Sequence, residues 1–189
     1  MIRIGIVGDI GCGKTFVANK FGYPVFNADL EVNKLYKTDG NCFRKLNKIL
    51  PKHIVSFPIT KADITYAILK NNFNLKKIIK IIHPLVRKKM NKFLVINKNK
   101  KIVVLDIPLL LENKINKKND VIVFVESKKS KIIKRLKKRK NFNKKLINKF
   151  KKIQLPIEYK KKKSQFIVRN NFSNKFLKKD INRVLERIL

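Results

Sequence analysis

The sequence predicts an α/β fold in which helices cover both faces of a five-stranded parallel sheet. Five short stretches rich in β-branched or aromatic residues have the character of buried strands, and the stretches between them have the apolar spacing of helices. Nearly continuous apolar strands separated by helices are typical of a parallel sheet that is buried on both sides. The expected strands cover residues 2–7, 24–28, 101–107, 121–126 and 165–169.

The pattern of helices indicates two attachments to this sheet. The expected helices cover residues 14–21, 29–37, 61–70, 75–96, 129–139, 143–153 and 174–188. Pro84 follows His83 inside the fourth of these and is expected to interrupt it. The stretch 29–97 contains helical patterns and no convincing strand, which predicts a helical insertion within one domain that spans residues 1–189. A lysine-rich, helix-prone region at 128–163 precedes the last strand.

Length and composition predict a cytoplasmic protein with a single core. The 189 residues, 44% of them hydrophobic, suffice for one substantial core. No segment approaches the roughly 18 consecutive apolar residues of a membrane span, and the first residues lack the layout of a signal peptide. Cys12 and Cys42 share no metal-ligand spacing, so a disulfide framework or zinc site is not expected.

The charge of the chain is strongly positive. Lys and Arg number 48 against 12 Asp and Glu, which gives +36. Such an excess is typical of proteins that bind nucleic acid, because neutralising phosphates releases counterions. Lys, Asn, Ile and Phe are abundant along the whole chain, however, as a biased base composition of the genome would produce. We favour this explanation and expect no specific nucleic-acid partner.

Residues 8–15, "GDIGCGKT", match the phosphate-binding pattern G-x-x-x-x-G-K-[ST] without a mismatch. The pattern lies between an expected strand and an expected helix, which is the arrangement that a P-loop requires. Glycines let backbone N–H groups turn toward phosphate oxygens, and the start of a helix adds its positive dipole end. We expect Lys14 to contact the β and γ phosphates of ATP and Thr15 to bind Mg²⁺. The fold class is therefore a P-loop NTPase three-layer sandwich.

Two residues inside this loop are unusual. Asp9 places a carboxylate where a triphosphate would repel it, unless the side chain points outward or approaches the metal. Cys12 lies near a helix N-terminus, where the pKa of a thiol is often lowered. We hypothesise that oxidation of Cys12 blocks ATP binding.

Two further carboxylates follow expected strands at the edge of the sheet where open α/β folds bind ligands. Asp29 follows the second strand and is positioned to accept a proton from an attacking hydroxyl. It could equally cap the helix that follows. Asp106 ends the third strand, from which a carboxylate can hold Mg²⁺ beside Thr15. The apolar residues 108–111 either pack in the core or line a pocket for an organic substrate.

Several blocks of sequence, taken in order, resemble the dephospho-coenzyme A kinase family. The blocks are "GDIGCGKT" at 8–15, "NAD" at 27–29, "HPLVR" at 83–87, "DIPLLLE" at 106–112, "IQLP" at 153–156 and "QFIVRNN" at 165–171. The resemblance implies transfer of the γ-phosphate of ATP to the ribose 3′-hydroxyl of dephospho-CoA, the last step of CoA biosynthesis. It also implies that 29–97 binds the acceptor and that 128–163 forms a helical lid.

The resemblance implies three sets of site residues. Asp29 is the base on the 3′-hydroxyl, and Lys14 and Arg139 assist catalysis. The residues that bind ATP are Gly8, Asp9, Ile10, Gly11, Cys12, Gly13, Lys14, Thr15, Phe16, Arg135 and Asn170. The residues that bind the acceptor are Asp29, His83, Arg87, Leu109, Leu110 and Glu112. From the residues alone, His83 could be a helix-breaking structural residue, and Arg135 and Arg139 could lie on a solvated helix face.

Departures from the family pattern keep other functions open. Asp9 replaces a glycine, Asn27 replaces an aspartate, and Lys149 and Lys61 stand near expected arginines. Lysine lacks the bidentate fork of arginine, so we expect an active but slower enzyme. One alternative is a nucleoside monophosphate kinase, although the insertion contains few arginines to hold a second phosphate. The other is a nucleic-acid-binding P-loop protein, although region 128–163 has few aromatic residues for base stacking.

Overall fold

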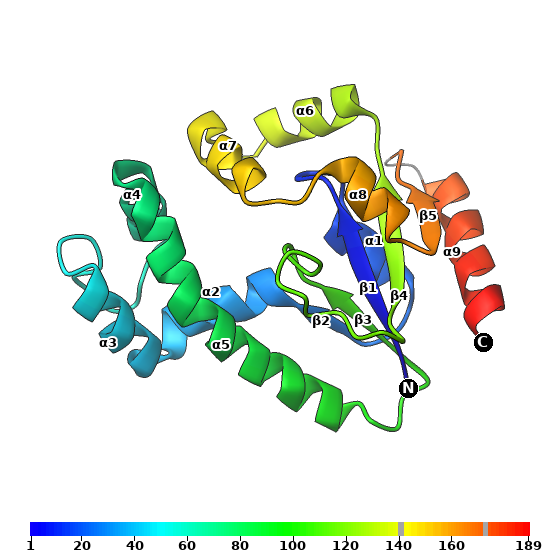
Figure 1. The fold of residues 1–189 in the computed structure, drawn as a ribbon, viewed down its shortest axis with the longest axis horizontal. Coiled ribbons are helices and arrows are strands. Elements are labelled where there is room, and N and C mark those ends of the chain that lie inside the picture. The colour runs from blue at the N-terminus through cyan, green and yellow to red at the C-terminus, as the bar shows by residue number, and fades with distance from the viewer. Residues whose placement is uncertain (140–141, 172–173) are drawn as a thin grey trace. The chain divides into compact units, whose positions relative to one another are not determined.

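The computed structural model describes residues 1–139, 142–171 and 174–189, and only the backbone of residues 174 and 175. Its sheet contains the five expected strands, all parallel, in the order β2-β3-β1-β4-β5 (Figure 1). The strands are β1 (Ile2–Gly8), β2 (Val25–Asn27), β3 (Ile102–Asp106), β4 (Val121–Glu126) and β5 (Phe166–Arg169). The predicted fold class and strand number are therefore confirmed.

The described helices include two that the sequence patterns did not predict, α3 and α8. The helices are α1 (Lys14–Lys20), α2 (Ala28–Thr38), α3 (Gly40–Ile49), α4 (Lys61–Lys70), α5 (Asn72–Ile96), α6 (Lys129–Lys137), α7 (Lys144–Lys152), α8 (Ile157–Lys162) and α9 (Asn174–Ile188). A local signal for α3 was present in the sequence. The side chain of Asp39 caps this helix by accepting a hydrogen bond of 2.9 Å from the backbone N–H of Cys42.

Helix α5 is continuous through Pro84, so the expected interruption at His83-Pro84 is wrong. A proline has no N–H and cannot bond the carbonyl four residues earlier, that of Lys80. The apolar face of α5 is buried on both sides of the proline, and this packing holds the helix together across the missing bond. Its buried apolar residues are Leu75, Ile78, Ile82 and Met90.

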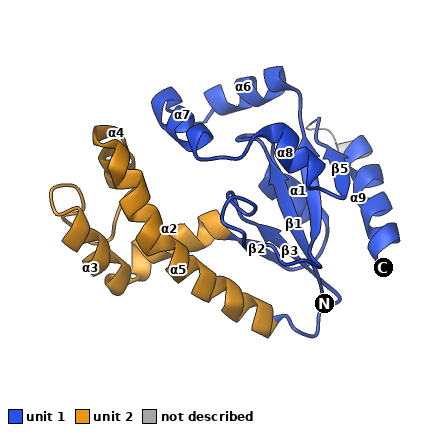
Figure 2. Ribbon diagram, viewed as in Figure 1, with its two compact units in different colours: residues 1–27, 97–189 blue, residues 28–96 orange. Residues whose placement is uncertain are grey.

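The chain forms two compact units (Figure 2). Unit 1 contains residues 1–27 and 97–189, with the sheet and helices α1 and α6–α9; unit 2 contains residues 28–96, with helices α2–α5. The expected lid region, 128–163, corresponds to α6–α8, and its residues 140 and 141 lie outside the described residues. In the part of the chain that the structure describes, no helix is both long and apolar enough to cross a membrane.

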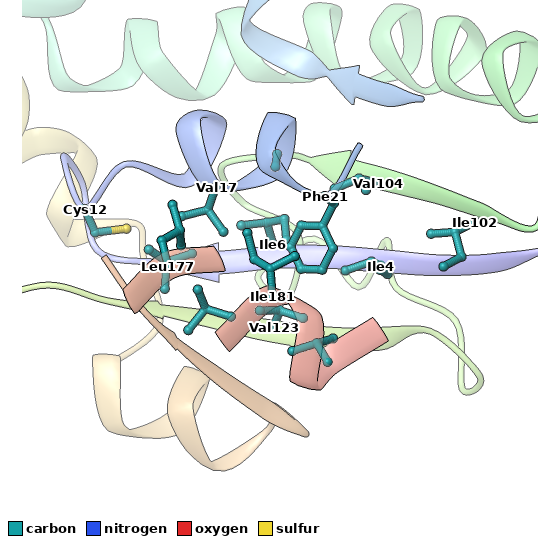
Figure 3. Packing of buried hydrophobic residues seen from close by; sticks show 14 of the residues in the cluster. Ile4, Ile6, Cys12, Val17, Phe21, Ile102, Val104, Val123, Leu177 and Ile181 are labelled. Carbon is teal, nitrogen blue, oxygen red and sulfur yellow. The ribbon is translucent and has the colours of Figure 1, made fainter. Parts of the chain in front are cut away.

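The main apolar cluster of unit 1 lies between one face of the sheet and helices α1 and α9 (Figure 3). Side chains alternate between the two faces of a strand, so Ile4 and Ile6 of β1 point into this cluster while Gly5 points to the opposite face. There, a Cβ atom on Gly5 would lie 2.5 Å from Cδ2 of Leu110 and 3.0 Å from Cδ1 of Ile122. The loop after β3 therefore packs directly on the central strand.

This close approach predicts that Gly5→Ala lowers the free energy of unfolding by about 1–3 kcal/mol, because a buried leucine must shift to admit the methyl group. Gly40→Ala is the matched control, since a Cβ atom on Gly40 meets no atom within 4 Å. Urea denaturation should show the control unchanged or slightly stabilised. Equal free energies of unfolding for the two variants would contradict this account of the packing.

Candidate active site

A glycine-rich turn joins β1 to α1 at the carboxyl end of the sheet. Gly13 precedes the first residue of α1 in a left-handed conformation. Gly8 has a positive φ of 150°, and a Cβ atom there would lie 2.8 Å from the carbonyl oxygen of Val125 in β4. No residue with a side chain fits this position without a shift of the backbone. The first glycine of the motif is therefore required for the loop to lie against the neighbouring strand.

Helix α6 packs on the loop at Gly11. A Cβ atom on Gly11 would lie 2.9 Å from Cγ of Leu136 and 3.2 Å from Cγ2 of Ile132, and both of these α6 residues are buried. The same helix carries Arg135, which is half-buried. Arg139 lies beyond the end of α6, in an exposed turn, so the predicted helix 129–139 is two residues too long.

The polar side chains of the loop contact its own backbone. The ammonium group of Lys14 donates to the carbonyl oxygens of Asp9, at 2.9 Å, and Gly8, at 3.3 Å. The carboxylate of Asp9 accepts a hydrogen bond of 2.7 Å from the N–H of Ile10. The carboxylate is thus held against the loop. Ile10 and Phe16, both predicted to bind ATP, are partly buried against the apolar cluster of unit 1.

Thr15, Asp106 and Asn27 meet at the carboxyl edge of the sheet. The carboxylate oxygen Oδ2 of Asp106 accepts from the hydroxyl of Thr15 at 2.6 Å and from the amide of Asn27 at 2.6 Å. Pairing of β2 with β3 places Asn27 opposite Asp106, and β3 also pairs with β1, which leads into the loop. Asp106 is 4% exposed. Because an amide can donate to a carboxylate where an aspartate would repel it, Asn27 fits its neighbour.

This arrangement brings together the two oxygen-bearing side chains expected to hold a metal ion. Among the described residues, no group of three or more His, Cys, Asp or Glu side chains forms a metal site. A hydroxyl and a carboxylate oxygen 2.6 Å apart are nevertheless ligands of the kind that Mg²⁺ uses when it retains several waters and binds substrate phosphates.

The expectation that Cys12 has a lowered pKa is wrong. The Cys12 side chain is 1% exposed and belongs to the apolar cluster, where Figure 3 shows its sulfur. Burial raises the pKa of the thiol above its ordinary value, and the nearby Lys14 ammonium only partly opposes this effect. A buried, protonated thiol is a poor nucleophile, so oxidation of Cys12 is not a reasonable switch for ATP binding.

The segment after Asp106 is tied to the base of the expected lid region by a buried ion pair. The ammonium group of Lys160 in α8 lies 2.7 Å from the carboxylate of Glu112, and their side chains are 2% and 9% exposed. Lys160 also donates to Gln154, and the N–H of Leu155 donates to Glu112. Of the predicted acceptor residues in this segment, Leu110 is buried and Leu109 half-buried.

Three predicted acceptor residues lie in unit 2. Asp29 is exposed and lies in the first turn of α2, which begins at Ala28. His83 and Arg87 are one turn apart on α5. Burial and, to a lesser extent, the Arg87 guanidinium lower the pKa of His83. Both effects favour the neutral imidazole over the imidazolium form.

Asn170, predicted to bind ATP, is fully buried and follows β5. Its side-chain amide donates a hydrogen bond of 2.8 Å to the backbone carbonyl of Cys12 in the phosphate-binding loop. Sequence reasoning did not identify Ser127 and Lys160 as parts of this region, and it noted Asn27 only as a departure from the family pattern. Ser127 could have been found because it stands directly after the end of β4, whereas nothing distinguished Lys160 from its lysine neighbours.

These features define a P-loop kinase. A glycine turn joins a strand to a helix, a Thr–Asp pair lies beside the turn, and the parallel sheet has the order 2-3-1-4-5. Comparison with known proteins gives the family. The sequence model for dephospho-CoA kinase matches residues 2–175, so the chain belongs to the dephospho-CoA kinase family.

Curated relatives agree over nearly the whole chain. The dephospho-CoA kinase of Wolbachia pipientis wMel is 33% identical over 190 residues, which cover 98% of this chain and 97% of the relative. The dephospho-CoA kinase of Rickettsia bellii is 32% identical over 191 residues, which cover 100% of this chain and 98% of the relative. The chain is therefore a dephospho-CoA kinase that uses ATP in the final step of CoA biosynthesis.

Solved structures show the same fold. A protein from Thermus thermophilus has a TM-score of 0.74 at 24% identity, with 99% of this chain and 95% of that chain covered. Dephospho-CoA kinase from Campylobacter jejuni has a TM-score of 0.65 at 22% identity, with 98% of this chain and 96% of that chain covered. Shikimate kinase from Acinetobacter baumannii is more distant, with a TM-score of 0.53 at 12% identity. The match covers 100% of this chain and 93% of that chain.

The buried ion pair predicts that Lys160→Met lowers the free energy of unfolding by about 3 kcal/mol or more, because the Glu112 carboxylate stays buried without its cation. A double variant, Lys160→Met with Glu112→Leu, should recover much of this loss. Lys161→Met is the matched control, since Lys161 is 39% exposed and should contribute little. Denaturation that shows equal stability for the Lys160 and Lys161 variants would contradict the assignment.

Burial of both cysteines predicts that neither reacts rapidly with a thiol reagent in the folded protein. Burial raises the pKa of Cys12 and also that of Cys42, to about 11, so both remain protonated near neutral pH. A chromogenic disulfide reagent should label both thiols only after denaturation, and Cys12→Ser should match the parent in its sensitivity to peroxide. Fast labelling that the serine substitution removes would show Cys12 to be accessible.

Proposed function

We propose that the loop at residues 8–15, together with Asp106, holds MgATP for transfer of its γ-phosphate to the ribose 3′-hydroxyl of dephospho-CoA. The observation that carries this proposal is the hydrogen bond of 2.6 Å between Thr15 and Asp106 beside the glycine turn. It unites a motif found in the sequence with a carboxylate 91 residues further along the chain. Such a pair is what a P-loop kinase requires for its metal-bound nucleotide.

Thr15 and Asp106 would hold the magnesium ion through their hydroxyl and carboxylate oxygens. A magnesium ion held by these two side chains would supply positive charge that offsets part of the charge on the transferring group. Asn27 keeps the Asp106 carboxylate oriented by donating to the same oxygen that Thr15 contacts. The chemistry of this donor set supports magnesium rather than a soft metal ion.

Lys14 would contact the β and γ phosphates. Its ammonium group lies within the loop, where it donates to the carbonyl oxygens of Gly8 and Asp9. Arg135 is proposed to contact the nucleotide from α6, whose residues Ile132 and Leu136 pack on Gly11. Arg139, in the exposed turn beyond α6, would add charge when the lid region covers the phosphates.

Asp29 would accept the proton of the 3′-hydroxyl. It follows Asn27 by two residues in the chain, and Asn27 is bonded to Asp106 at the edge of the sheet. His83 and Arg87, with Leu109, Leu110 and Glu112, are proposed to form the acceptor site, although Leu110 and Glu112 act at least partly through packing and the Lys160 ion pair. Closure of residues 128–163 would exclude water, which otherwise competes for the γ-phosphate.

Asp29→Asn tests the proposed proton acceptor. Because the amide cannot take a proton, kcat should fall by roughly a hundredfold or more, while the KM for ATP stays within about twofold of the parent. Glu31→Gln is the matched control, since it replaces another carboxylate in the first turn of α2 and should leave kcat nearly unchanged. Steady-state kinetics that show equal losses of kcat and ATP affinity for Asp29→Asn would make Asp29 a structural residue.

A further inference from the structure

The carbonyl group of Cys12, in the middle of the phosphate-binding loop, is held by two side chains that directly follow the carboxyl ends of β4 and β5. Asn170, directly after β5, donates its amide N–H to the Cys12 oxygen at 2.8 Å. The hydroxyl of Ser127, directly after β4, lies 2.9 Å from the same oxygen. A single backbone oxygen thus accepts from two side chains that are more than 110 residues away in the chain.

These two side chains are themselves fixed. The backbone N–H of Asn170 donates to the carbonyl of Glu126 at 2.8 Å. The carbonyl oxygen of Asn170 lies 2.9 Å from the Ser127 hydroxyl. This hydroxyl has one hydrogen, which it shares between the carbonyl oxygens of Asn170 and Cys12. Asn170 is 0% exposed. A buried asparagine with this many partners has little freedom to rotate, so it sets the direction of the Cys12 carbonyl.

The direction of this carbonyl determines where the next N–H points. In a planar trans peptide, the C=O of one residue and the N–H of the next point in opposite directions. Because the oxygen of Cys12 is held toward the ends of β4 and β5, the N–H of Gly13 points away from them. Gly13 immediately precedes α1, and N–H groups at the start of a helix are those that phosphate oxygens accept from.

We propose that Ser127 and Asn170 are positioning residues for nucleotide binding, which act by holding the peptide between Cys12 and Gly13 so that the Gly13 N–H faces the phosphates. Neither side chain needs to touch ATP for this effect. The inference rests on the proposed phosphate-binding role of residues 8–15. Asn170 would then act through the loop instead of through direct contact with ATP.

Calorimetric titration with ADP and steady-state kinetics test this proposal. Ser127→Ala should weaken ADP binding by about five- to tenfold and raise the KM for ATP to a similar extent, because one anchor of the carbonyl is lost. Asn170→Leu, which keeps the branched shape and removes the amide, should weaken ADP binding at least as much. The KM for dephospho-CoA should stay within about twofold of that of the parent protein. Ser127→Thr, which keeps the hydroxyl, should bind ADP as the parent does.

Ser130→Ala is the matched control, because Ser130 is an exposed serine three residues further along the same region. A folded Ser127→Ala protein that binds ADP within twofold of the parent would overturn the proposal. Equal increases in the KM for both substrates would also overturn it, since they would indicate a general loss of structure. ADP titration needs neither acceptor nor turnover, so it separates this inference from the proposed function. If the parent protein failed to phosphorylate dephospho-CoA, the proposed function would be refuted. Weaker ADP binding by the Ser127→Ala and Asn170→Leu variants would still support this inference.

Discussion

Parallel pairing of β1 with both β3 and β4 is the constraint on which the rest of unit 1 depends. It brings the carboxyl ends of three strands to one edge of the sheet, so that the glycine turn after β1, Asp106 at the end of β3 and Ser127 after β4 become neighbours. The Thr15–Asp106 hydrogen bond follows directly from this register. A slip of one residue in β3 would turn the carboxylate to the other face of the sheet and remove the bond.

The phosphate-binding loop is held on several sides by different kinds of interaction. Packing fixes it at Gly11 beneath α6, and close backbone approach fixes it at Gly8 beside β4. Hydrogen bonds from Ser127 and Asn170 fix the Cys12 carbonyl, while the Cys12 side chain is buried in the apolar cluster. A loop restrained in this way presents its N–H groups without reorganisation, which is the condition for strong electrostatic stabilisation of a transferring phosphoryl group.

Local patterns in the sequence were sufficient for the five strands, the glycine loop and Asp106 at the end of β3, because each depends on short-range periodicity or on a motif. They failed where tertiary packing decides. Pro84 stays helical because apolar residues on both sides of it are buried, and burial reverses the expected pKa shift of Cys12. Lys160 was indistinguishable among so many lysines, since only the fold shows that its side chain enters the interior to meet Glu112.

Transfer of phosphate from ATP to dephospho-CoA at this edge of the sheet can be measured directly. The most direct measurement is ADP release by the purified protein with MgATP, in the presence and absence of dephospho-CoA, with the mass of the product determined. We expect ADP release that depends on dephospho-CoA, and a product heavier by one phosphate, with the mass of CoA. ADP release that is indifferent to dephospho-CoA, or an unmodified acceptor, would contradict it.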